Sequence, residues 1–286
     1  MSIDVAWLSM KFTDLNNLAS LSSGGQKWVF SADHATDGDV VLKLFKPSGT
    51  PSEVELVFRE MIAVQTVASD RVPEILEHGE IDTQLGRCFW FREQRIAGND
   101  LSNVLQAGPL NTGRLLRLGR HMLDALSKAE EEQIVHRDVK PQNIMMDATE
   151  NFWLLDFGLA RHLTLTSITP TADPFGKCTP GYAPPEQFRN IKSEIDARAD
   201  LFALGVTLYE CATGSIVFRQ VARTVLEVLH NVETKPLVPL SLSFGSANEF
   251  RDLVATMTQK RRDHRPLTVA EALDWMRDIC SRENIA

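Results

Sequence analysis

One stretch of the sequence, residues 134–158, restricts the possible folds more than any other; it reads IVHRDVKPQNIMMDATENFWLLDFG. Two short apolar runs, Ile144–Met146 and Phe152–Leu155, are separated by polar residues, and this pattern predicts a β-hairpin. Because the hairpin reverses the chain, we expect Asn143 before its first strand to lie beside Asp156 after its second. An amide oxygen and a carboxylate placed in this way suit Mg²⁺, which prefers oxygen ligands and often shares them with phosphate.

The same stretch carries further charged groups just before the hairpin. Asp138 and Lys140 come first, Asn143 follows Asp138 by five residues, and Asp156 follows Asn143 by thirteen. A carboxylate, an ammonium and an amide therefore share one short loop, and the hairpin brings a second carboxylate back to them. The ordered set H-R-D-x-K-P-x-N followed by D-F-G resembles the catalytic core of eukaryotic-type (Hanks-type) Ser/Thr protein kinases, in particular their soluble bacterial members.

The resemblance covers roughly residues 18–279 and implies an α+β, bilobal protein-kinase fold. We expect a single kinase domain over residues 1–286. Its N-lobe, about 1–93, should hold a five-stranded antiparallel sheet and one helix. A hinge at about 94–98 should lead to a larger, mainly helical C-lobe at about 99–286.

Composition excludes several other classes of protein. The net charge of −8 gives no basic field that would attract nucleic acid or an anionic membrane surface. The longest apolar run, Leu201–Leu208, is too short to cross a bilayer, and the N-terminus lacks the pattern of a secretory signal. The four cysteines are scattered without metal-ligand or disulfide spacing, so we expect free thiols and a cytoplasmic location.

The segment from Leu21 to Leu44 predicts three antiparallel strands joined by tight turns. Within it, residues 22–29 take the place of the kinase glycine-rich loop, in which missing side chains let backbone N–H groups approach phosphate oxygens. The middle glycine is kept, another follows it, and Lys27 replaces the last glycine, so we expect weakened nucleotide affinity. The nucleotide-contacting residues that the resemblance implies in this loop are Ser22, Gly24, Gly25 and Val29.

Residues 40–43 match the strand that carries the kinase lysine, here Lys43, which by resemblance grips the α- and β-phosphates of ATP. A lysine in an apolar strand needs a partner for its charge. The expected partner is Glu60, seventeen residues later on a predicted helix. Gln94 and Ile96 fall at the expected hinge, where kinases hold adenine mostly through backbone groups.

A hydroxyl-rich loop, Thr164–Thr171, follows the hairpin and resembles a kinase activation segment. Arg137 directly precedes Asp138, and the resemblance implies that its guanidinium pairs with a phosphate on this loop. We therefore expect autophosphorylation there, at Thr169 or Thr171. The segment closes with CTPGYAPPE, in which Thr179 holds the position typical of Ser/Thr kinases.

Two buried polar contacts and one helix start are also expected. By resemblance, Asp200 should bind the backbone of the turn at residues 136–137, and Glu186 should form an ion pair with Arg265. A capping box at residues 268–271 predicts the start of the last helix.

The resemblance implies that the chain transfers phosphate from ATP to Ser or Thr hydroxyls of a protein. Asp138 would orient the hydroxyl and take its proton, and Lys140 would neutralise charge on the phosphoryl group. Asn143 and Asp156 would hold Mg²⁺, with Mn²⁺ as an alternative. The sequence does not identify the substrate protein; a transient homodimer could serve autophosphorylation in trans.

Two other functions stay open on the sequence alone. A pseudokinase scaffold or nucleotide-sensing module is favoured by the altered glycine-rich loop, but Lys43, Asp138, Asn143 and Asp156 are all present. A kinase of small-molecule hydroxyl substrates would share the fold and a related loop. The Lys140-Pro141 pair argues against it, as does the close of the activation segment.

Overall fold

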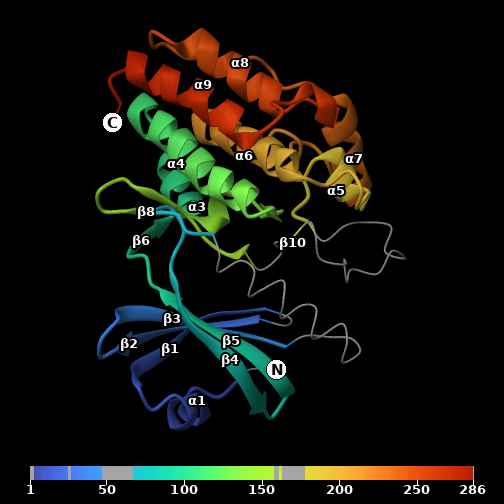
Figure 1. Cartoon of the computed structure of the whole chain (residues 1–286). Helices are drawn as coiled ribbons and strands as arrows, with labels where there is room; N and C mark the ends of the chain where they lie inside the picture. Colours follow the sequence, from blue (N-terminus) through green and yellow to red (C-terminus); the bar gives the residue numbers. More distant parts are fainter. Residues whose placement is uncertain (1–2, 25–26, 47–66, 158–160, 163–177, 286) are drawn as a thin grey trace. The chain divides into compact units, whose positions relative to one another are not determined.

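The computed structural model describes residues 3–24, 27–46, 67–157, 161–162 and 178–285 (Figure 1). The chain divides into two compact units. The first consists of Met1–Gln65 and Pro73–Ala97, and the second of Thr66–Val72 and Gly98–Ala286.

The first unit is built on an antiparallel sheet of five strands in the order β1-β2-β3-β5-β4. The strands are β1 (Leu15–Gly24), β2 (Lys27–His34), β3 (Gly38–Phe45), β4 (Ile75–Thr83) and β5 (Gly86–Gln94). The sheet expected from the sequence is thus confirmed, although β1 begins before the expected start at Leu21. The earlier start follows from Leu15, which is buried in the core of this unit.

The two faces of this sheet have different roles. On one face, Leu42 and its alternate neighbours in β3 pack with Phe30 of β2 and with Leu8 of helix α1 (Val5–Lys11). Side chains alternate along a strand, so Val41 and Lys43 point to the opposite face. The apolar core therefore occupies one face, and the expected nucleotide-binding lysine stands on the other.

The second unit is mainly helical, as expected (Figure 1). Its helices are α3 (Leu101–Val104), α4 (Thr112–Glu131), α5 (Pro185–Phe188), α6 (Ala197–Thr213), α7 (Val225–Thr234), α8 (Ala247–Met257) and α9 (Val269–Arg282). Short 3-10 helices in the described part of this unit include η2 (Leu105–Ala107), η3 (Pro141–Asn143) and η5 (Arg262–His264). Two small sheets are formed by β6 (Gly98–Asp100), β8 (Ile144–Asp147) and β9 (Phe152–Leu154), and by β7 (Ile134–Val135) and β10 (Arg161–His162).

The core of this unit lies where α4 packs against α6 and α9 (Figure 1). Helix α4 buries an apolar stripe that includes Leu118 and Met122, whereas α6 is apolar on nearly every side and is buried along most of its length. Gly119 allows close contact between α4 and α9, because a Cβ there would lie 2.4 Å from Cε of Met276. In the described part of the chain, no helix combines the length and the apolar character needed to span a membrane.

Helix starts in this unit follow their sequence signals. The Asp196 carboxylate caps α6 by accepting a hydrogen bond from the Arg198 N–H. Thr268 caps α9 by accepting from the Glu271 N–H at 3.1 Å, which confirms the predicted start. The Glu271 carboxylate accepts from the Leu267 N–H at 2.8 Å, one residue before the cap itself.

The expected pair between Glu186 and Arg265 is confirmed as a buried bidentate ion pair. Arg265 Nη1 lies 2.6 Å from Glu186 Oε1, and Nη2 lies 3.1 Å from Oε2. The same guanidinium donates to the carbonyl oxygens of Gln259, Arg198 and Lys260. A buried charge pair is tolerated when its remaining donors are satisfied in this way, so the pair fixes the loop after α8 to α5.

Lys260, next to this ion pair, is a buried cation with weaker compensation. Its Nζ has no hydrogen-bond partner among the described residues, and it lies 4.0 Å from the ring centroid of Phe218. Burial, reinforced by the charge of Arg265, lowers the pKa of Lys260 to about 8. The contact with the ring stabilises the ammonium by about 0.5–2 kcal/mol, which offsets only part of the cost of desolvation.

Replacing Lys260 with methionine should therefore stabilise the chain by about 1 kcal/mol near pH 7, because it removes a desolvated charge and keeps the volume. The unfolded chain binds this proton more tightly than the folded chain does. Wild-type stability should thus rise as the pH increases from about 8 to 10.5, and the variant should lack this rise. Denaturant unfolding at both ends of this range tests the prediction, with the exposed Lys235→Met as control. Loss of stability at pH 7 together with an unchanged alkaline rise would contradict it.

Candidate active site

The loop that holds the predicted catalytic residues is fixed by one buried carboxylate. Asp200, near the start of α6, accepts hydrogen bonds from the backbone N–H groups of His136 and Arg137, both at 2.7 Å, as expected. Burial raises the pKa of Asp200 to about 7, although the two N–H donors oppose this shift by favouring the carboxylate. These two bonds set the backbone of the loop directly before Asp138.

His136 connects this loop to the segment after β9. It is fully buried, and burial lowers its pKa, so the imidazole is neutral. Its Nδ1 accepts from the Asp138 N–H at 3.2 Å, which assigns the proton to Nε2, 2.9 Å from the Leu155 carbonyl oxygen. The ring also packs edge-on against Phe157, with centroids 4.5 Å apart.

Two residues of this region adopt a backbone conformation that is uncommon without glycine. The φ angles are 70° for Arg137 and 67° for Asp156. Such conformations cost free energy and persist where the surrounding contacts impose them, often at functional sites. Here the hydrogen bonds to Asp200 hold the backbone of Arg137. Asp156 lies directly after the β8–β9 hairpin.

Four predicted residues of the catalytic loop and the activation segment meet at one carboxylate. Asp138 Oδ2 accepts from Lys140 Nζ at 2.6 Å and from Asn143 Nδ2 at 2.8 Å. Asp138 Oδ1 accepts from the Thr179 hydroxyl at 2.6 Å, and Lys140 Nζ also donates to that hydroxyl at 2.7 Å. The carboxylate is thus oriented by a cation and an amide, and it accepts a hydrogen bond from an alcohol.

The predicted hairpin is confirmed, and Asp156 directly follows Leu155, which is hydrogen-bonded to Asn143. Ile144 pairs with Leu154, and the Leu155 N–H donates to the Asn143 carbonyl oxygen at 2.8 Å. The Asn143 Nδ2 is engaged by Asp138, so the side-chain oxygen is the atom available as a metal ligand. An amide oxygen and a carboxylate form a donor set that fits a hard divalent cation.

In the first unit, Lys43 lies directly opposite Val29 across β2 and β3, so two predicted nucleotide-binding residues are neighbours. Lys43 Nζ forms an ion pair with Glu93 Oε1 at 2.5 Å. The expected partner, Glu60, lies outside the described residues, and that pairing stays a prediction. Glu93 was missed; its signal in the sequence is an acidic side chain at the end of the mostly apolar strand β5.

The segment in place of the glycine-rich loop is a hairpin whose strands β1 and β2 are paired as far as Gly24 and Lys27. Ser22 pairs with Val29 and Gly24 pairs with Lys27, whereas Gly25 lies outside the described residues. The Lys27 ammonium lies 5.6 Å from the ring centroid of Phe45, its cross-strand partner. Position 27 therefore carries a long side chain where the kinase motif has a glycine, as the altered motif indicates.

The expected hinge follows β5. Gln94 is the last residue of β5, and its N–H donates to the Glu74 carbonyl oxygen at 2.8 Å. Ile96 lies two residues further on, half-buried, between β5 and β6. Adenine binding by either residue stays a prediction.

The activation segment is described only near its end. Thr169 and Thr171 lie outside the described residues, whereas Thr179 is in contact with Asp138. The following residues are well anchored: the Gln187 amide donates to the Arg137 carbonyl oxygen at 2.6 Å. Burial raises the pKa of Cys178 to about 11, so this thiol next to Thr179 is protonated.

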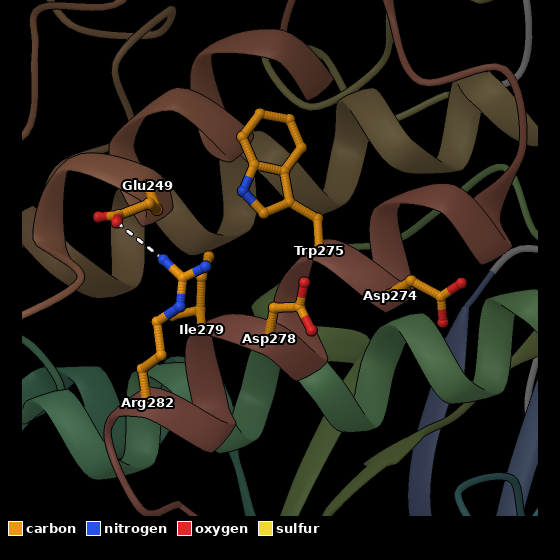
Figure 2. Close-up of a pocket in the computed structure, with 6 residues that line it drawn as sticks. All are labelled: Glu249, Asp274, Trp275, Asp278, Ile279 and Arg282. Carbon is orange, nitrogen blue, oxygen red and sulfur yellow. Dashed lines mark hydrogen bonds and ion pairs between the residues drawn. The ribbon is translucent and has the colours of Figure 1, made fainter.

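A cavity of about 380 Å³ lies between α8 and α9 (Figure 2). Figure 2 shows Arg282 directed toward Glu249. Arg282 Nη1 lies 3.0 Å from Glu249 Oε1. The lining residues are Glu249, Asp274, Trp275, Asp278, Ile279 and Arg282. None of them belongs to the catalytic loop or the hairpin, so this cavity is separate from the catalytic groups.

Comparison with known proteins agrees with this geometry. Residues 15–276 match the family described as "Protein kinase domain". The chain is 32% identical to Serine/threonine-protein kinase PknH of Mycobacterium tuberculosis over 253 residues, which cover 86% of this chain and 38% of that protein. It is 34% identical to Serine/threonine-protein kinase pkn3 of Myxococcus xanthus over 228 residues, which cover 76% of this chain and 41% of that protein.

The chain thus spans about two fifths of the length of the curated relatives that it matches. Membership of this family implies the use of ATP and a divalent metal ion. The buried anchor at Asp200, the groups gathered on Asp138 and the extent of the family match together show that this chain belongs to the protein kinase domain family.

Proposed function

We propose that this chain transfers the γ-phosphoryl group of ATP to Ser and Thr hydroxyls of protein substrates. The observation that carries the proposal is the Asp138 carboxylate, which Lys140 and Asn143 hold while it accepts a hydrogen bond from the Thr179 hydroxyl. A substrate hydroxyl needs the same acceptor. The relatives named as serine/threonine-protein kinases support the same substrate class.

Phosphoryl transfer needs little covalent help from a protein, so catalysis depends on positioning and charge. Asp138 orients the acceptor hydroxyl and takes its proton, and Lys140 neutralises charge that develops on the transferred group. Asn143 and Asp156 offer oxygen ligands for Mg²⁺, with Mn²⁺ as the alternative. When bound, this metal supplies a positive charge against the phosphates. Lys43 would bind the α- and β-phosphates, as the resemblance implies.

The link between Lys140 and Thr179 supports an alcohol rather than a phenol as the acceptor. Lys140 Nζ lies 2.6 Å from Asp138 and 2.7 Å from the Thr179 hydroxyl, so it joins the end of the activation segment to the catalytic carboxylate. A short aliphatic alcohol that reaches Asp138 stays close to both residues. The pseudokinase alternative is not favoured, because every residue that the reaction requires is present in the sequence.

Replacing Asp138 with alanine or asparagine should lower the rate of phosphate transfer about 10²–10⁴-fold, because the proton acceptor is lost. Asparagine keeps the size of the side chain, so it separates chemistry from packing. Transfer of labelled γ-phosphate to a generic Ser/Thr protein substrate measures the effect. Asp252→Asn, an exposed acid on α8, serves as the matched control. A wild-type rate in both Asp138 variants would refute the assignment.

Replacing Thr179 with alanine should lower kcat about tenfold, because Asp138 and Lys140 lose a shared hydrogen-bond partner at the active site. Thr179→Ser keeps the hydroxyl and should retain most of the activity. Steady-state kinetics of the two variants form a matched pair. Equal losses in both would show that the methyl group matters, and not the hydroxyl.

We also propose that the chain phosphorylates its own activation segment, at Thr169 or Thr171, by a transient homodimer acting in trans. The support is Arg137, whose guanidinium can pair bidentately with a phosphate, as in kinases with this arginine.

Incubation with ATP should label a catalytically inactive D138A chain when active chain is added. Phosphopeptide mapping should place the label within residues 164–171. Arg137→Lys should weaken the activating effect, because an ammonium lacks the bidentate fork. An active enzyme without modification in this segment would contradict the proposal.

A reducing compartment, the cytoplasm, is proposed as the location. The support is the state of Cys88, Cys178, Cys211 and Cys280, which are all free thiols.

A further inference from the structure

Cross-strand register places Lys43 and Glu93 on the same face of the sheet. Lys43 of β3 pairs with Phe91 of β5, and Val41, two residues earlier, pairs with Glu93. Residues two apart on a strand share a face, so Lys43 and Glu93 are diagonal neighbours. Diagonal neighbours in antiparallel sheets are within reach when their side chains are long.

The two side chains use this placement to form a short, shielded ion pair. Lys43 Nζ and Glu93 Oε1 are 2.5 Å apart, and the side chains are only 10% and 13% exposed. Charges so poorly solvated are costly unless they are paired. The contact therefore neutralises a lysine that stands in an otherwise apolar strand.

The neighbouring cation does not compete for Glu93. Arg92 points to the other face of β5, because adjacent residues of a strand alternate. There it pairs with Asp14 at 2.5 Å and with Glu77 at 2.8 Å. The adjacent charges Arg92 and Glu93 thus serve separate networks, and Glu93 is directed toward Lys43.

We propose that Glu93 is a positioning residue for nucleotide binding: its carboxylate holds the Lys43 ammonium on the sheet face where Val29 also lies. This inference rests on the proposed function, in which Lys43 binds phosphate groups. An ammonium has three N–H donors, so a bond to one carboxylate oxygen leaves it able to donate to phosphate oxygens as well. The two residues stand on hydrogen-bonded neighbouring strands, so the sheet itself fixes the position of the lysine.

The inference predicts a loss of nucleotide affinity that depends on the Glu93 carboxylate. Without this carboxylate, the Lys43 ammonium loses the contact that holds it on this face of the sheet. Glu93→Gln should therefore weaken nucleotide binding about tenfold. A residue that only supports the fold would not lose this effect when Lys43 is also replaced.

Isothermal titration of the full chain with Mg²⁺ and a non-hydrolysable ATP analogue tests the inference. Glu93→Asp, which keeps the charge, should recover part of the affinity. Glu80→Gln is the matched control, since Glu80 of β4 forms an ion pair with Arg87 of β5 that does not involve Lys43. In a Lys43→Met background, Glu93→Gln should cause no further loss, because Glu93 acts through Lys43.

Assays of stability and of phosphate transfer distinguish a failure of this inference from a failure of the proposed function. The double variant K43M/E93Q removes both charges of the Lys43–Glu93 pair, so it supports the comparison if E93Q alone is unstable. Unchanged or tighter binding by E93Q would overturn the inference, as would equal losses in wild-type and K43M backgrounds. If wild type binds but transfers no phosphate, the proposed function fails while these binding data still decide the role of Glu93.

Discussion

The catalytic loop depends on one interaction: the buried Asp200 carboxylate accepts the backbone N–H groups of His136 and Arg137. These two bonds cross from helix α6 to a loop 63 and 64 residues away in sequence. They hold Arg137 in a left-handed conformation that the loop would not otherwise retain. Asp138 follows directly, so its carboxylate has a defined position before any substrate arrives. A helix that is buried along most of its length thereby supports the backbone before Asp138.

Charge pairing on rigid elements recurs in both units. Asp138 is paired with Lys140 on one loop, and Lys43 is paired with Glu93 across two strands. In each pair a partly buried cation is neutralised by a carboxylate and can still donate to a further acceptor. Lys260 is different, because its ammonium rests on an aromatic ring and not on a carboxylate. The cost of burying Lys260 shows why the proposed functional cations, Lys140 and Lys43, are paired with carboxylates.

Local patterns in the sequence predicted much of this arrangement. The β8–β9 hairpin followed from two apolar runs around a polar turn, and the start of α9 followed from the Thr268 capping box. The role of Glu93 was not predicted, because its contact with Lys43 depends on strand register, and pairs of strands far apart in sequence have no local signal for register. The contact of Thr179 with Asp138 joins residues 41 apart, and only the resemblance to kinases had suggested that Thr179 matters.

The central claim is that the Asp138 carboxylate accepts a proton from an aliphatic hydroxyl during phosphate transfer from ATP. The most direct measurement compares transfer of labelled γ-phosphate to three peptides that differ only in carrying Ser, Thr or Tyr at one position. The account predicts label on the Ser and Thr peptides and little on the Tyr peptide. Equal labelling of the Tyr peptide would contradict the assigned substrate class. Absence of transfer to every peptide and to the chain itself, despite nucleotide binding, would contradict the catalytic role of Asp138.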